Sequence, residues 1–202
     1  MNEAIARDYL NDALSSFRAY RKLAEKAVEQ LKDQELFITL DEEGNSVAVI
    51  MKHMAGNMIS RWTDFLTSDG EKPDRHRDME FVIEPDTTKQ DVMAYWQRGW
   101  ECVFGALEPL TLEDFDKKIL IRGEAHSIVQ AINRQMAHYA YHIGQIVFLA
   151  KHFRSSEWNS LSIPKNKSAE FNSFLSTSSR TADREKQFDA VVDFARKSET
   201  NS

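Results

Sequence analysis

The sequence contains few of the residues that break or redirect a helix. Its 202 residues include only 7 glycines and 4 prolines. Tight turns are therefore scarce, and a small number of long helices is favoured over many short strands. A chain of this length can bury one substantial core. We therefore expect an all-α protein with one main domain.

Cysteine is nearly absent, with Cys102 as its single example. An internal disulfide is therefore impossible, and a scaffold held together by disulfides is excluded. Cys102 lies in an apolar stretch of an expected helix, where a packing role is simpler than a nucleophilic one. The composition suits a reducing compartment.

The sequence also lacks long apolar runs and an excess of basic residues. No stretch approaches the roughly 20 apolar residues that a membrane span needs, and residues 1–10 lack the apolar centre of a signal peptide. The 32 acidic side chains outnumber the 26 basic ones, for a formal net charge of -6. No basic stripe is dense enough to follow a phosphate backbone. We expect a cytoplasmic protein that binds neither membranes nor nucleic acid.

Four segments repeat apolar residues at helical spacing. The expected helices cover residues 2–32, 46–66, 88–108 and 127–153. The last three begin with residues that can cap a helix, namely Ser46, Thr88 and Ser127. Asp91 and Gln130 follow Thr88 and Ser127 by three residues, as in a capping box. These residues therefore predict where the three helices begin.

The remaining segments are less regular. Residues 71–86 are charged and contain two prolines, which predicts a long surface loop with a short strand near residues 81–83. The length of this loop suggests a functional or partner-binding role. A further short strand is expected at residues 118–122. We expect the main domain to span residues 1–175, and residues 176–202 to form a tail that either is mobile or docks as one helix.

Two histidines of the fourth expected helix predict a metal site. His138 and His142 are four residues apart, so they project from one helix face, close enough to bind one cation. That face should point into the protein, where unpaired imidazoles are costly. His53 lies among apolar residues of the second expected helix and is the expected third ligand. The alternative, in which these histidines are hydrogen-bonded core residues, stays open.

The type of site can be narrowed further. Three histidine ligands leave coordination positions for water or substrate, as in catalytic zinc sites. Tyr139 stands where the zinc-protease motif H-E-x-x-H has its glutamate, so a protease of that type is excluded. Asn57, Arg61, Gln135 and Gln145 lie one or two turns from the predicted ligands and could orient them. Their alternative role is polar packing.

Three segments together resemble the DinB-like superfamily of four-helix metalloproteins, and in particular one of its uncharacterised bacterial branches. The segments are 51–62 (MKHMAGNMISRW), 138–145 (HYAYHIGQ) and 162–165 (SIPK). The resemblance covers about residues 2–175. It implies an up-down-down-up four-helix bundle with a long crossover between helices two and three. It also implies a homodimer, and a divalent transition metal, zinc or nickel, on His53, His138 and His142.

The same resemblance suggests classes of function. Characterised members of the superfamily include thiol-dependent S-transferases and isomerases. The implied function is a metal-dependent enzyme of the S-transferase or hydrolase type, acting on a low-molecular-weight thiol or another small molecule. Arg61 and Arg134 are the basic residues available to hold the carboxylates of a thiol cofactor. The alternative is a non-catalytic protein that binds a metal or a partner.

Overall fold

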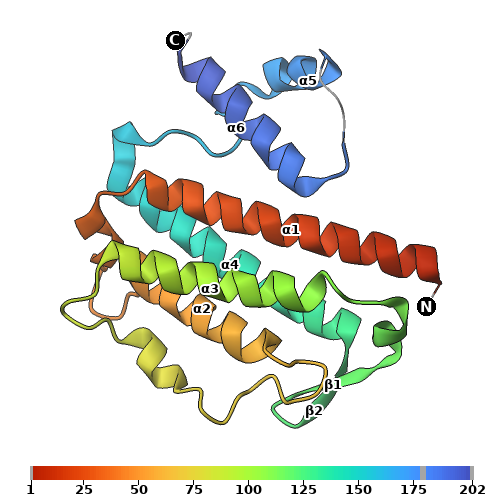
Figure 1. Ribbon diagram of the computed structural model, residues 1–202. Helices are drawn as coiled ribbons and strands as arrows, with labels where there is room; N and C mark the ends of the chain where they lie inside the picture. The colour runs from red at the N-terminus through yellow and green to blue at the C-terminus, as the bar shows by residue number, and fades with distance from the viewer. Residues whose placement is uncertain (1, 178–180, 201–202) are drawn as a thin grey trace.

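Most of the chain is helical in this computed structural model, which describes residues 2–177 and 181–200 (Figure 1). The α-helices are α1 (Glu3–Glu29), α2 (Val47–Trp62), α3 (Lys89–Leu107), α4 (Ile128–Arg154), α5 (Ser168–Thr177) and α6 (Arg184–Thr200). Short 3-10 helices are η1 (Asp33–Phe37), η2 (Arg77–Phe81), η3 (Leu112–Asp116) and η4 (Ser155–Glu157). Two strands, β1 (Lys118–Ile121) and β2 (Glu124–Ser127), form one sheet. Within the described ranges, no helix combines the length and apolar character of a membrane span.

The long helices α1 to α4 lie side by side and share one hydrophobic core (Figure 1). The most extensive packing joins α2 to α3 and α1 to α4. Trp62, Trp100 and Tyr139 are among the largest fully buried side chains. Trp62 Nε1 donates a hydrogen bond to the Tyr139 hydroxyl at 3.0 Å, which pairs two polar atoms inside the core. The expectation of a mainly α-helical protein is confirmed.

The three predicted helix caps are confirmed. Ser46 Oγ accepts a hydrogen bond from the backbone of α2, and Thr88 and Ser127 form capping boxes with Asp91 and Gln130. These bonds pair backbone N–H groups that the first helical turn leaves without partners. The starts of α2, α3 and α4 were therefore predictable from residues at the cap itself.

Two expectations about local structure are wrong. The second helix ends at Trp62 rather than near residue 66, because Thr63 is extended and Asp64 has φ 47°. The strand expected near residues 81–83 is absent from the described structure, where residues 77–81 instead form η2 against α2. A 3-10 turn suits this segment because it directs Glu80 inward, to a buried position on α2.

The small sheet is a β-hairpin, of which only the first strand was expected. β1 pairs antiparallel with β2. Arg122 and Gly123, the two residues between the strands, have φ of 56° and 77°. Positive φ at both positions is the geometry of a tight hairpin turn. The hairpin places Arg122 above the loop that follows α2, where its backbone N–H bonds Asp69 at 2.8 Å.

In the C-terminal segment, α6 packs on α1, and α5 contacts α6 (Figure 1). Lys22 of α1 contacts Glu185 and Asp189 of α6 at 2.9 and 2.8 Å, and Val192 of α6 joins the main core. In the described part of the expected tail, residues 184–200 are thus a docked helix. The rest of that tail at residues 178–180 and 201–202 lies outside the described residues.

A close approach of α2 and α3 gives the first prediction. A Cβ added at Gly99 would come within 2.9 Å of the Ala55 Cα. We expect Gly99→Ala to lower the free energy of unfolding by about 1–3 kcal/mol, because the two helices would have to separate. Denaturant unfolding followed by circular dichroism measures the change.

The control is Gly105→Ala on the same helix, where an added Cβ would meet nothing within 4 Å. It should raise the free energy of unfolding by up to about 1 kcal/mol through helix propensity alone. Equal effects of the two substitutions would show that Gly99 does not set the spacing of α2 and α3.

Candidate metal centre

Three histidines converge between α2 and α4. His53 comes from α2, and His138 and His142 come from successive turns of α4. One ligand atom of each lies within 4.8 Å of those of the other two, so the group could hold a metal ion. His138 Nε2 and His142 Nε2 are 3.1 Å apart. Over the described ranges, no other group of three or more His, Cys, Asp or Glu residues meets this condition.

Hydrogen bonds fix the protonation pattern of two of these rings. His53 Nδ1 donates to Glu80 Oε2 at 2.8 Å, and His142 Nδ1 donates to Gln145 Oε1 at 2.8 Å. Gln145 Nε2 in turn donates to the Tyr141 hydroxyl at 3.1 Å, which directs its oxygen toward His142. Since both acceptors are oxygens, each Nδ1 carries a proton, and Nε2 is the nitrogen of each ring that can bind a metal. Metal-binding histidines are commonly oriented in this way, so the donor set fits a metal.

His138 and His142 are neutral near pH 7. His53 is buried, and His138 and His142 are half-buried. Burial, together with the nearby His142 and His53, lowers the pKa of His138 to about 3. Burial also lowers the pKa of His142. Neutral imidazole is the form that binds metals, so His138 and His142 need to release no proton to bind a metal at neutral pH.

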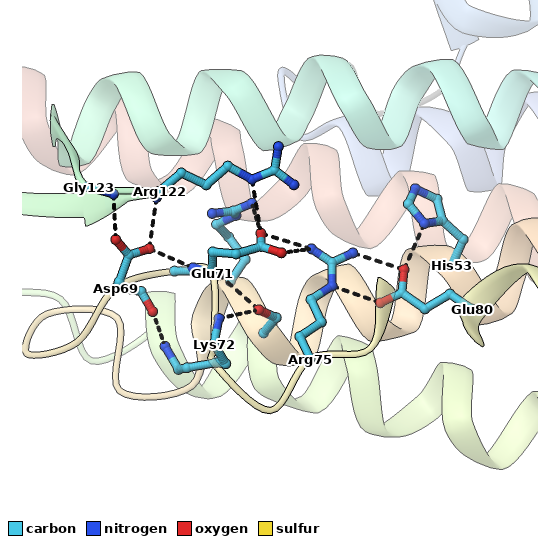
Figure 2. A network of polar contacts seen from close by, with 11 residues as sticks. His53, Asp69, Glu71, Lys72, Arg75, Glu80, Arg122 and Gly123 are labelled. Atoms are coloured by element: carbon cyan, nitrogen blue, oxygen red, sulfur yellow. Dashed lines mark hydrogen bonds and ion pairs between the residues drawn. The ribbon is translucent and has the colours of Figure 1, made fainter. Parts of the chain in front are cut away.

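Glu80 connects the site to a network of buried charges (Figure 2). Arg75 Nε and Nη2 donate to the two oxygens of Glu80 at 2.7 and 2.9 Å, and Arg75 Nη1 reaches Glu71 at 3.2 Å. Burial alone would raise the pKa of Glu80, but the bonds from His53 and Arg75 hold the pKa below its usual range. Glu80 therefore stays a carboxylate and supports the Nδ1–H form of His53.

The sequence did not reveal Glu80, Arg75 or Glu71 as site residues. All three lie in the charged segment 71–86, whose length had suggested a function. No spacing rule relates Glu80 to His53, because the two are 27 residues apart and on different elements. Their contact depends on how the loop folds back on α2.

The structure separates the candidate orienting residues into two groups. Gln145 bonds His142 directly. Asn57, Arg61 and Gln135 are buried and line a cavity of about 240 Å³ on the other side of the site, next to His53 and His138. Arg134, considered for a cofactor carboxylate, lines the same cavity.

Other residues considered from the sequence lie away from this centre. Tyr139 is fully buried and bonds Trp62 instead. Cys102 packs against the core, which agrees with a packing role. His76 and His152 are exposed, and His126 lies in β2 with its Nδ1 2.9 Å from the Glu124 carbonyl oxygen. None of the three joins the group that could hold a metal.

The bond between His53 and Glu80 gives the second prediction. We expect Glu80→Gln to weaken metal binding by about tenfold or more, because a neutral amide supports the His53 ring less well than a carboxylate. Glu84→Gln, which removes the same charge from an exposed position in the same loop, should bind metal as the wild type does. Competition with a chromophoric chelator measures both affinities. An unchanged affinity in Glu80→Gln would rule out a role for Glu80 in orienting His53.

A substitution at Gly56 tests the contact between His53 and Glu80 by steric displacement. A Cβ at Gly56 would overlap the Glu80 carboxylate, which Arg75 holds in place. We expect Gly56→Ala to displace Glu80 from His53 and to weaken metal binding by about tenfold. Alanine has a higher helix propensity than glycine, which should offset part of the loss in free energy of unfolding. Metal affinity should therefore fall more than stability does. If Gly56→Ala binds metal as tightly as Gly105→Ala, the space at Gly56 is irrelevant to the site.

Comparison with known proteins gives one match. Residues 4–167 match the profile of a family described as "Protein of unknown function (DUF1572)". Searches against curated proteins and against solved structures found no match. The matched range includes all three histidines, Glu80 and the residues that line the cavity. The chain belongs to the DUF1572 family of proteins of unknown function.

Proposed function

We propose that the protein is a divalent-metal-dependent enzyme in which His53, His138 and His142 hold one zinc or nickel ion. The observation that carries the proposal is the convergence of the three ligand atoms within 4.8 Å of one another. The fixed Nδ1–H forms of His53 and His142 support it, because they leave Nε2 available on both rings. Core histidines that merely pack would not need this arrangement.

The surroundings of the histidines favour catalysis over a purely structural site. Structural zinc sites have four protein ligands and are closed, whereas three ligands leave a position for water or substrate. A cavity adjoins His53 and His138. Bound there, the metal would act as a Lewis acid or lower the pKa of a bound water or thiol. Glu80 and Gln145 would hold two of the ligand rings, and Asn57 and Gln135 would line the space for substrate.

The bundle topology, the oligomeric state and the reaction class that we propose follow the resemblance to the DinB-like superfamily. We place the four long helices in an up-down-down-up bundle, with residues 63–88 as the crossover between α2 and α3. The positions of the three histidines on the second and fourth long helices support this assignment. The proposal includes a homodimer in the cytoplasm and a thiol-dependent S-transferase or hydrolase reaction on a small molecule.

Metal content is the direct test. Protein purified without a His tag or chelator should contain about one equivalent of a transition metal by plasma mass spectrometry. His53→Ala, His138→Ala and His142→Ala should each lose it, whereas His76→Ala, which changes an exposed histidine of the loop, should keep it. A wild-type protein that stays metal-free after exposure to zinc, nickel and manganese would overturn the proposal.

A second measurement separates catalysis from a structural role. If the metal is catalytic, His142→Ala should abolish thiol transfer or hydrolysis while the helical spectrum and thermal midpoint change little. If the metal is structural, its loss should lower the thermal midpoint markedly, because metal binding then contributes to folding. A large drop in the midpoint, with no turnover by the metal-loaded wild type, would favour the non-catalytic alternative.

A further inference from the structure

The cavity beside the histidines is unusually rich in arginine. Five arginines line it, namely Arg61, Arg75, Arg77, Arg122 and Arg134. His53 and His138 line the same space, so the cavity is continuous with the candidate metal centre. No carboxylate is among its lining residues. A concave site lined by one sign of charge concentrates ligands of the opposite sign.

Nearby carboxylates offset only part of this charge. Glu71 is shared by Arg61, Arg75 and Arg122, at 3.6, 3.2 and 3.3 Å. Glu80 is already occupied by Arg75 and His53. A third carboxylate, Asp69, accepts the backbone N–H groups of Arg122 and Gly123. Five guanidinium groups thus face three carboxylates, each of which has other partners.

Two of the arginines have little or no pairing of their own. Arg134 makes no hydrogen bond or ion pair with the residues that the structure describes. Among the described residues, Arg77 has one carboxylate partner, Asp78, at 3.9 Å, and that carboxylate is fully exposed. The Arg77 guanidinium also lies over the Phe81 ring, 5.1 Å from its centroid, a contact that does not neutralise its charge. The positive charge of the cavity therefore exceeds what the surrounding residues of the described chain neutralise.

Arg61 shows that the cavity is built for a polar ligand. It is 4% exposed, yet its Nε and Nη1 have no hydrogen-bond partner among the described residues. The same holds for Asn57 Oδ1 and Gln135 Oε1, which belong to two further residues lining the cavity. Buried polar atoms are nearly always paired in folded proteins. The two unpaired donors of Arg61 therefore indicate a missing acceptor, and the unpaired oxygens of Asn57 and Gln135 indicate a missing donor, such as a hydroxyl or amine of the same ligand. Gly70 leaves room for the guanidinium, since a Cβ there would come within 2.9 Å of Arg61 Nη1.

We propose that this cavity binds the oxyanion group, a carboxylate or a phosphate, of a small substrate whose other end reaches the three histidines. Guanidinium groups match both oxyanions with paired hydrogen bonds. His53, Asn57 and Arg61 follow one another at four-residue steps, which spans about 12 Å along α2. The oxyanion end and the metal end of the site are therefore about two helical turns apart along α2. The assignment of a substrate rests on the proposed function, but the anion site itself requires only the arginines.

The experiment titrates metal-free protein with inorganic phosphate and, separately, with malonate, by isothermal calorimetry. We expect at least one probe to bind the wild type. Arg61→Met should weaken that binding by at least about tenfold, the loss expected for one charge-assisted hydrogen bond. Binding of phosphate alone assigns a phosphate group to the substrate, and binding of malonate alone assigns a carboxylate.

Two further variants guard against an effect of misfolding. Arg134→Gln changes an exposed residue of α4 and should also weaken binding, with an unchanged unfolding transition. Lys151→Gln removes a charge from an exposed position 17 residues further along α4 and should bind as the wild type does. The proposal is overturned if neither probe binds, or if Arg61→Met and Arg134→Gln both bind as tightly as Lys151→Gln.

His142→Ala separates this proposal from the metal-enzyme proposal. His142 is not among the residues that line the cavity, so this variant should lose the metal and still bind the anion probe. Anion binding that depends on Arg61 in a protein that never binds metal would support the cavity and refute the metal site. Metal binding without anion binding would support the metal site and refute the anion site.

Discussion

The buried carboxylate of Glu80 is the contact on which the rest of the site depends. It joins three parts of the chain, because it accepts hydrogen bonds from His53 on α2 and from Arg75 in the loop, while lying on η2 itself. Removing one partner from a buried charge is costly, of the order of 3–5 kcal/mol. The position of His53, the fold of the loop and the placement of Arg75 beside the cavity are therefore linked. A substitution that alters His53, the loop or Arg75 should therefore also alter the other two.

Helical spacing supplies the remaining geometry. One face of α2 carries His53, Asn57 and Arg61 at four-residue steps, so the proposed metal end and the proposed anion end of the site lie along a single helix. Gln135 and His138 present the facing side from α4. Rigid helices hold such groups more accurately than loops do. The arginines that come from loops are either fixed by carboxylates, as Arg75 is, or exposed at the rim, as Arg122 is.

The sequence predicted what depends on neighbours within one or two turns. Helix caps at Ser46, Thr88 and Ser127 are local, and so is the pairing of His138 with His142. His53 could be predicted from its apolar surroundings on an amphipathic helix. By contrast, η2 was not predicted, and residues 77–80 were expected to be loop. Its inward-facing residue is charged, and a buried Glu80 is stable only because Arg75 and His53 are its partners. The cavity could not be predicted from the sequence either, because its arginines come from separate elements, namely α2, α4, η2, the loop before η2 and the hairpin.

The two proposed halves of the site reinforce each other electrostatically. Neutral imidazoles do not cancel the charge of a divalent ion, and Glu80, the carboxylate that contacts His53, is already paired with Arg75. A bound metal would therefore add positive charge beside a cavity that already has an excess of guanidinium groups. The metal and the guanidinium groups would both attract an anionic substrate, and both would repel a cationic substrate. Charge alone would then discriminate between the two classes of substrate, without any shape-specific contact. Charge of a single sign across the metal centre and the cavity thus restricts the class of substrate more strongly than the histidines alone do.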